Sequence, residues 1–250
     1  MSSNTSLAFG AGVLIGTPSS ANATPVQFGT LQDVSLDFSF STKSLVGQFQ
    51  FPVAFGRGEG KISGKAKFAN IDGAVFSSLF FGNTATVGQK KWSYNEAGTI
   101  PASTPWQVTV ANSTTFDADL GVVFASSGLP LTKVASGPIT GQYSVAAGIY
   151  TFATADAGKA VLISYSYTTT TSGSRSVIGN AQMGVAPTFQ IDFYDVNPNI
   201  AGAQWSLRLY ACSASKLSLA SKTSDFTIPE LDFEAFANAA NSIGEVNTAV

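Results

Sequence analysis

The stretch "DVSLDFSF", residues 33–40, alternates polar and apolar residues without interruption. Val34, Leu36, Phe38 and Phe40 fall on one side of an extended chain, and the aspartates and serines between them fall on the other. A period of two residues is typical of a β-strand with one buried face. The stretch therefore predicts a strand whose apolar face packs on a core, and it leaves open what its polar face meets.

Two further stretches continue this alternation. In "QFQFPVAF" (48–55) and "KISGKAKF" (61–68) the apolar residues again occupy every second position. We interpret residues 41–47 as a polar connector and "GRGEG" (56–60) as a glycine-rich turn, which makes three short strands. Pro52 removes a backbone donor, so we expect the second strand to be bulged or to lie at a sheet edge at this point.

The polar faces of these three strands carry charge in a graded order. The first strand presents acids, the second amides and the third bases, namely Asp33 and Asp37, Gln48 and Gln50, and Lys61, Lys65 and Lys67. If the strands are neighbours, these side chains pair across them. Such a face suits either water or a complementary copy of the same chain.

The alternation stops at "NIDGAVFSSLFFG" (70–82), where the apolar residues follow a helical spacing. Asn70 or Asp72 is a possible N-cap, and Gly82 stands where a helix would stop. We expect a short amphipathic helix that packs on the sheet through Val75, Phe76, Leu79 and Phe80.

Short strands between turn residues dominate the next hundred residues. They are expected at 104–110, 118–125, 141–152 and 159–169. We interpret residues 88–180 as an inserted all-β module in a discontinuous core domain made of 1–87 and 181–250. The core is expected to resume with strands at 187–196, 203–213, 216–221 ("KLSLAS") and within 225–236, where Pro229 splits the last one.

The composition excludes several classes of function. Of 250 residues, 11% are charged and the net charge is −2, so the chain has no basic field to hold nucleic acid. It has no histidine, which removes the commonest general base and metal ligand, and Cys212 is its single cysteine. We expect no enzyme activity and no cofactor, and we interpret Cys212 as a small core residue.

The N-terminal run "LAFGAGVLIG" followed by "ANA" resembles a signal peptide, but no Lys or Arg precedes Lys43. No stretch approaches the ~20 apolar residues of a membrane span. We therefore expect a soluble protein that is neither exported by a signal nor inserted in a membrane.

Two motifs could bind a ligand or take part in catalysis, but each also has a simpler structural explanation. "GRGEGKISG" (56–64) lacks the spacing of a phosphate-binding loop and leads into a strand, so a hairpin turn is favoured. Asp192 with Asp195, and Glu230 with Asp232 and Glu234, have the spacing of an acid–base pair or a cation site. Because solvated strand faces carry carboxylates routinely, we favour a structural role for them.

The order of these elements resembles that of the tail tube proteins of long-tailed bacteriophages. The resemblance is carried by the stretch from Leu31 to Phe68, the helical stretch 70–82 and the terminal "DFTIPELDFEAF". The segment "GQYSVAAGIYTFATADAGKAVLISYSYT" (141–168) also resembles an accessory module of phage structural proteins. Together these stretches cover about two thirds of the chain.

The resemblance implies a mainly β protein, with a β-sandwich or barrel core, one flanking helix and an inserted all-β domain that projects outward. It implies hexameric rings that stack into a tube in the virion, assembled in the host cytoplasm, together with other tail proteins. DNA passes through such a tube without specific binding. The candidate lumen face is Asp33, Asp37, Gln48, Gln50, Lys65 and Lys67, and the candidate inter-ring loop is Thr42, Lys43, Ser44, Leu45 and Val46.

The lysines depart from the acidic lumen that the resemblance implies. Either Asp33 and Asp37 neutralise them, or the assignment of faces is partly wrong. Three alternatives to a tail tube protein stay open: another virion part, such as a distal tail or capsid-decorating protein; the tube protein of a secretion system; and a carbohydrate-binding β module. The last would stack sugars on Trp92, Trp106, Trp205 and the tyrosines.

Overall fold

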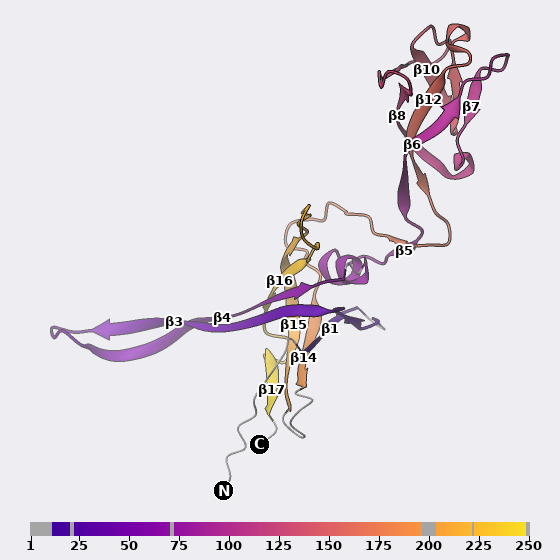
Figure 1. The fold of residues 1–250 in the computed structure, drawn as a ribbon. Helices are drawn as coiled ribbons and strands as arrows, with labels where there is room; N and C mark the ends of the chain where they lie inside the picture. The colour runs from indigo at the N-terminus through magenta and orange to yellow at the C-terminus, as the bar shows by residue number, and fades with distance from the viewer. Residues whose placement is uncertain (1–11, 21–22, 71–72, 197–203, 222, 249–250) are drawn as a thin grey trace. The chain divides into compact units, whose positions relative to one another are not determined.

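The computed structural model describes residues 12–20, 23–70, 73–196, 204–221 and 223–248. The protein is mainly β, as the sequence predicts. It consists of two compact units, one formed by residues 1–85 and 176–250 and the other by residues 86–175 (Figure 1). The sequence predicts the inserted module at residues 88–180. We describe each unit separately.

The first unit is built on one antiparallel sheet. Its strand order is β2-β1-β14-β15-β16-β4-β3, and β17 pairs with β15. The strands are β1 (Val13–Pro18), β2 (Val26–Gln27), β3 (Leu31–Val46), β4 (Pro52–Phe68), β14 (Phe189–Val196), β15 (Gln204–Ser218), β16 (Glu230–Ala235) and β17 (Gly244–Thr248).

The prediction of three short strands between residues 33 and 68 is wrong. The structure has a single long hairpin instead, in which β3 and β4 pair from Leu31 and Phe68 to Val46 and Pro52. The expected connector 41–47 and the expected turn 56–60 lie almost wholly within these strands, and the turn is made by residues 47–51. Glycines in "GRGEG" therefore belong to a strand, where they signal a bulge.

That bulge explains why the apolar pattern changes phase within β4. Phe40 pairs with Gly60, but Thr42 pairs with Arg57, so two residues of β4, Gly58 and Glu59, lie opposite one residue of β3. One extra residue moves every later side chain of the strand to the other face. Odd-numbered Phe55 therefore shares a face with even-numbered Ile62, Ala66 and Phe68. A second irregularity, opposite Val46, falls at Pro52, as predicted.

Only the half of the hairpin nearest the sheet is supported by other strands. β16 pairs with β4 from Ile62 to Lys67, and no described strand pairs with residues 52–61 of β4 except β3. The far half, which we call the arm (residues 38–61), runs beyond the sheet as a two-stranded ribbon (Figure 1).

The core of the first unit lies between the apolar face of this sheet and one short helix. The helical segment 73–80, with η1 (Val75–Phe80) in π conformation, buries Val75 and Leu79 completely, as its spacing predicts. No side chain caps its start at Ala74, and Asp72 lies outside the described residues. Gly82 follows its end with a φ of 65°, a conformation that glycine adopts readily.

Three parts of the sheet differ from the sequence-based expectation. The expected separate strand 216–221 is in large part the end of β15, which runs on through register shifts near Tyr210 and Ser215. The last four residues of the run that resembles a signal peptide, 13–16, lie in β1, which pairs with β14, and residues 7–11 of the run lie outside the described residues. β17, which was not predicted, pairs with the first half of β15.

The second unit is a small β-sandwich. One sheet has the order β6 (Lys90–Thr99), β12 (Ala160–Thr168), β8 (Phe116–Phe124), and the other has β7 (Gln107–Thr109), β11 (Ile149–Phe152), β10 (Gln142–Ala146), β9 (Thr132–Lys133). Both sheets contribute to one buried cluster that includes Tyr150, Phe152, Ile163 and Tyr165. A two-stranded ribbon, β5 (Thr86–Val87) with β13 (Ser174–Arg175), joins the ends of this unit.

One expected strand of the second unit is a hairpin. Residues 141–152 form β10 and β11, and the chain reverses at Ala147 and Gly148, whose φ angles are 47° and 76°. Two consecutive positive φ angles are typical of the tight turn that matches strand twist. Alternation continues through such a turn, which is why the sequence pattern conceals it.

Because each unit has its own core, a core truncation should destabilise one unit alone. We expect Phe233→Ala to lower the free energy of unfolding of the first unit by about 3–5 kcal/mol, and Ile163→Ala to lower that of the second by about 2–5 kcal/mol. Hydrogen exchange measured by mass spectrometry in mild denaturant separates the two. Equal loss of protection in both units after either change would contradict this division.

Candidate assembly surfaces

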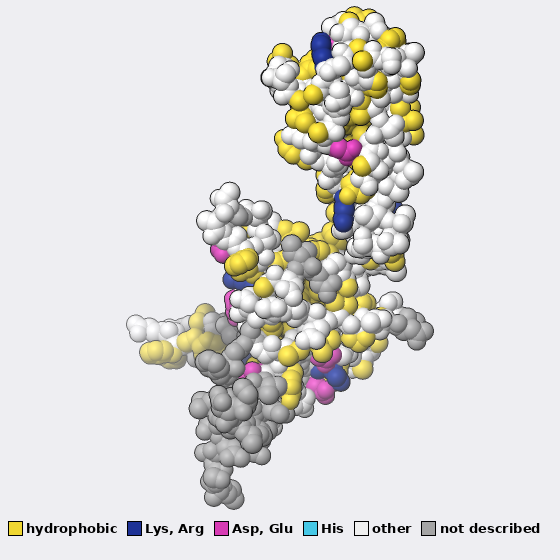
Figure 2. Space-filling view, turned by 45° about the vertical axis from the view of Figure 1, so that its right-hand side comes forward, with side chains coloured by type: hydrophobic (Ala, Val, Ile, Leu, Met, Phe, Trp, Pro, Cys, Tyr) yellow, Lys and Arg dark blue, Asp and Glu magenta, His cyan; other side chains and the backbone are white. Residues whose placement is uncertain are grey.

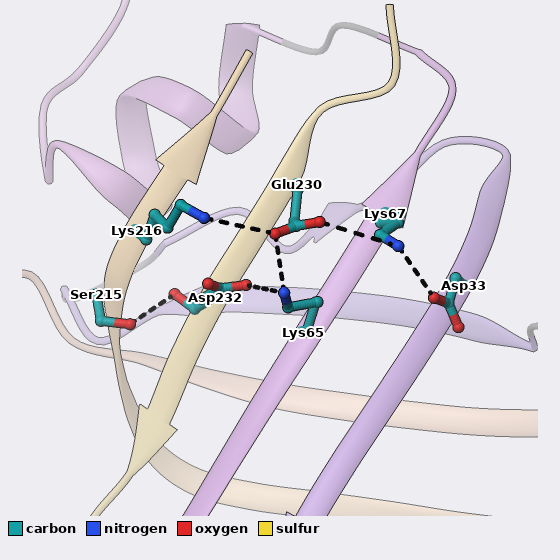
Figure 3. Close-up of polar contacts among 7 residues, drawn as sticks. All are labelled: Asp33, Lys65, Lys67, Ser215, Lys216, Glu230 and Asp232. Atoms are coloured by element: carbon teal, nitrogen blue, oxygen red, sulfur yellow. Dashed lines mark hydrogen bonds and ion pairs between the residues drawn. The ribbon is translucent and has the colours of Figure 1, made fainter. Parts of the chain in front are cut away.

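The outer face of the sheet carries a ladder of opposite charges, which we call the ion-pair face (Figure 3). In one row, Asp33 on β3, Lys67 on β4 and Glu230 on β16 lie opposite one another. In the next, Ser35, Lys65, Asp232 and Lys216 do so on β3, β4, β16 and β15. Acid and base therefore alternate from strand to strand, which is the arrangement that stabilises cross-strand pairs.

Glu230 is the centre of this face. Its carboxylate accepts a hydrogen bond from Lys65 Nζ at 2.9 Å and lies 3.7 Å from Lys216 Nζ and 4.0 Å from Lys67 Nζ. The hydrogen bond from Lys65 lowers the pKa of Glu230, and the same bond, with the charge of Asp232, raises the pKa of Lys65. Both shifts show that the charged forms favour each other.

The remaining charges of the face are also largely paired. Lys67 lies 3.5 Å from Asp33, Lys65 lies 3.7 Å from Asp232, and Lys61 lies 2.7 Å from Glu234. Within the ladder itself, the five carboxylates of Asp33, Asp37, Glu230, Asp232 and Glu234 meet the four lysines Lys61, Lys65, Lys67 and Lys216, so one negative charge is in excess. The lysines are neutralised mainly by β16, because Lys61 and Lys65 have their partners on that strand.

The structure brings together only part of the predicted lumen face. Asp33, Asp37, Lys65 and Lys67 share the outer face of the sheet. Gln48 and Gln50 do not: they lie in the hairpin turn of residues 47–51, because the chain does not begin a new strand there. The residues Glu230, Asp232 and Glu234, which the sequence suggested as an acid–base or cation site, instead complete the ladder.

The predicted inter-ring loop is not a loop. Thr42, Lys43, Ser44, Leu45 and Val46 form the far end of β3, and each pairs with a residue of β4. The prediction fails because its polar residues were read as a connector, whereas a two-stranded ribbon exposes both faces and tolerates polar residues on either. The five residues nevertheless lie on the arm, beyond the supported part of the sheet.

The second pair of candidate acids is separated by the pleat of β14. Asp192 lies on the outer face, where it forms an ion pair with Arg208, while Asp195 is buried and accepts a hydrogen bond from Trp205 Nε1 at 3.2 Å. The two carboxylates therefore do not form an acid–base pair. Among the described residues, no three side chains of His, Cys, Asp or Glu come together as a metal-binding group.

The arm carries a large apolar surface that the described residues leave uncovered. Of residues 33–40, only Val34 and Leu36 pack against the core, so the prediction that the whole apolar face of this stretch is buried is wrong for Phe38 and Phe40. Phe38, Phe40 and Phe55 lie on one face, and Phe49 and Phe51 lie in the turn; these five side chains are between 52% and 80% exposed. Arg57 covers part of Phe40, with its guanidinium carbon 4.6 Å from the ring centre. Figure 2 shows hydrophobic side chains gathered towards the end of the arm. Soluble monomers rarely expose an apolar patch of this extent.

The sheet also has an open margin. β3 is the last strand in the sheet order, so in the described structure the 16 residues of its outer edge have no strand partner. An edge strand of this length presents unpaired backbone donors and acceptors to another chain. The charged residues and bulges along β3 hinder pairing with another chain at some positions of this edge, but not along its whole length.

The tryptophans occupy different environments, and so does the cysteine. Trp92 is 68% exposed on β6, and Tyr94, next to it on the same strand, is 83% exposed. Trp106 Nε1 is buried and has no hydrogen-bond partner among the described residues, while Trp205 packs against Phe193 with the ring centres 4.9 Å apart. Cys212 is fully buried in the core, as predicted, and burial raises its pKa to about 12.

Comparisons with known proteins assign no family: no protein-family model matches the chain, and no curated protein sequence matches it. In the part of the chain that the structure describes, no helix has the length and hydropathy needed to cross a membrane.

The ladder makes stability depend on pH through Glu230. Because its pKa is lowered in the folded protein, its pairing stabilises the fold above its ordinary pKa and is lost as the pH falls through the lowered value. We expect Glu230→Gln to lower the melting temperature at pH 7 and to have a smaller effect at pH 3, because protonation of wild-type Glu230 progressively removes its pairing as the pH falls. Thermal melts between pH 3 and pH 8 measure this difference.

Glu59→Gln is the matched control, because it removes an exposed carboxylate from the arm rather than from the ladder. An equal effect of Glu230→Gln at both pH values would show that its charge does not matter.

Burial should also make Cys212 inert in the folded protein. We expect an aromatic disulfide reagent at pH 8 to leave it unmodified for hours and to modify it at once in 8 M urea, because the thiolate is the reacting form. Rapid modification of the native protein would contradict the placement of Cys212 in a closed core.

Proposed function

We propose that this protein is a structural subunit that assembles with copies of itself into the tail tube of a bacteriophage. One observation carries the proposal: a long hairpin, whose outer edge is open and whose apolar arm is uncovered, extends from an otherwise well-packed sheet. A second chain could pair with the open edge and cover the apolar arm. The resemblance noted in the sequence adds the tube as the form of the assembly.

Closure of a ring would give the open edge of each sheet a strand partner. When sheets join edge to edge around a ring, each open strand pairs with a strand of the neighbouring subunit, and no edge is left. Six copies in a ring, stacked ring on ring, would place the ion-pair face of every sheet on the inside. The apolar face of the sheet is not available for this, because it covers the core with η1.

The ion-pair face suits a channel through which DNA slides. A surface that binds DNA must offer unpaired cations to phosphate groups. Here each of the four ladder lysines lies within 4.0 Å of at least one carboxylate, and carboxylates are in excess by one within the ladder. DNA would therefore find few free cations to bind, which supports passage without specific contact. The inserted unit would lie on the outside of the tube.

Electron microscopy of the purified protein tests the proposal. We expect negative-stain images at increasing concentration to show six-fold rings or uniform tubes, and light scattering to show masses in multiples of the ring. A particle that stays monomeric at high concentration would contradict any assembly role. Caps or irregular shells instead of tubes would favour the alternative of another virion part.

The arm should be required for assembly. We expect Phe49→Ser combined with Phe51→Ser to reduce assembly at least tenfold without changing the melting temperature, because these side chains are exposed and do not support the core. Tyr94→Ser is the control, since it removes a similarly exposed aromatic residue from the second unit. Loss of assembly in the control alone would move the contact to that unit.

A carbohydrate-binding function of the second unit is the second candidate, favoured by the exposed pair Trp92 and Tyr94 on β6. Exposed aromatic rings can stack on sugars. Binding on a glycan array that is lost in Trp92→Ala would support this function.

A further inference from the structure

The described residues of the first unit enclose an open groove. It has a volume of about 980 Å³ and lies beside η1, between the segment that joins β1 to β2 and the segments 82–85 and 187–188. Its walls include Pro18, Pro25, Pro187, Val26, Ser78 and Thr84. All of them belong to the first unit.

The lining suits an uncharged peptide segment rather than an ion. It combines prolines and alanines with hydroxyl and amide side chains, and none of the described residues that line it is charged. Prolines and small residues leave flat apolar walls with room for large rings, and hydroxyl groups can satisfy the backbone of an entering turn. A volume of this size is enough to surround the tip of a hairpin that carries two aromatic side chains.

The arm ends in such a tip. Phe49 is 74% exposed and Phe51 is 80% exposed, and they occupy the turn between β3 and β4. The five exposed phenylalanines of the arm present on the order of 650 Å² of apolar surface, taking about 200 Å² for each ring. Phe49 and Phe51 supply about 300 Å² of it, taking the same area for each ring.

The tip cannot reach the groove of its own chain. β3 and β4 form one end of the sheet, whereas β1 and β2, which lead into the groove, form the other end. The arm also leaves the sheet along the strand direction: its ten residues 52–61 in β4 extend about 30 Å past the last residue paired with β16. An occupant from another copy is therefore required.

We propose that the arm tip of one copy, through Phe49 and Phe51, inserts into the groove beside η1 of the next copy. This inference rests on the proposed self-assembly and names its contact. Because tip and groove are different surfaces, the contact is heterologous and leaves a free tip and a free groove at the two ends, so it can continue from copy to copy. Packing of two arms against each other would instead close a dimer.

Cysteine pairs test this contact in the assembled protein. Phe51→Cys and Thr84→Cys are made in separate chains, mixed under conditions of assembly and oxidised gently; Cys212 adds little background because it is buried. We expect the mixed disulfide between the two variants to form at least about tenfold faster than with the control Leu219→Cys, which is exposed on the same unit outside the groove lining.

Each outcome is decisive. Disulfides mainly between two Phe51→Cys chains would replace the groove with arm-to-arm packing. Tubes in the microscope without the mixed disulfide would overturn the groove contact and leave the proposed function intact, whereas the absence of any assembly of the wild-type protein would overturn both.

A groove-filling variant covers the case in which the cysteine variants fail to fold. We expect Thr84→Trp to reduce assembly at least tenfold and Leu219→Trp to leave it unchanged, with the same melting temperature for both. Normal tubes from Thr84→Trp would overturn the groove contact.

Discussion

The structure of the first unit depends on how β4 is paired. Near Phe68 this strand has β3 on one side and β16 on the other, but beyond Ile62 it has β3 alone. The supported half is held closely: a Cβ on Gly64 would lie 2.2 Å from the ring of Phe233, so glycine lets that ring pack against the backbone. The unsupported half becomes the arm. One strand therefore provides both the wall of a core and a surface without a partner.

The same pairing gives the two faces of the sheet different roles. The inner face meets η1 and is apolar, whereas the outer face places Lys65 and Lys67 between acids of β3 and β16. Exposed ion pairs contribute little to stability one at a time. Their arrangement matters more for binding, because a lysine that is already paired with a carboxylate binds a phosphate group less strongly than a free lysine does. One register therefore both joins the strands of the sheet and pairs the ladder lysines with carboxylates.

The errors of sequence-based prediction arise where the phase of the apolar pattern does not follow the turns, or where a strand has no apolar pattern. Three strands were predicted where two exist because a bulge at Gly58 and Glu59 shifts the phase of the apolar pattern, and a phase shift resembles a turn. Residues 141–152 gave the opposite error, since a two-residue turn preserves the phase. β17 was missed because all five of its residues are exposed, so no apolar periodicity marks it.

The sequence by itself determined the mainly β character, the core-facing side of Val34 and Leu36, the buried helical stripe of Val75 and Leu79 and the core position of Cys212, because each depends on local spacing or residue type. Only the tertiary structure decided that Lys65 meets Glu230, that Asp192 and Asp195 lie on opposite faces of β14, and that no described strand supports the arm. Lys65 and Glu230 are 165 residues apart in the chain. Contacts of that kind depend on strand order and register, which local patterns do not encode.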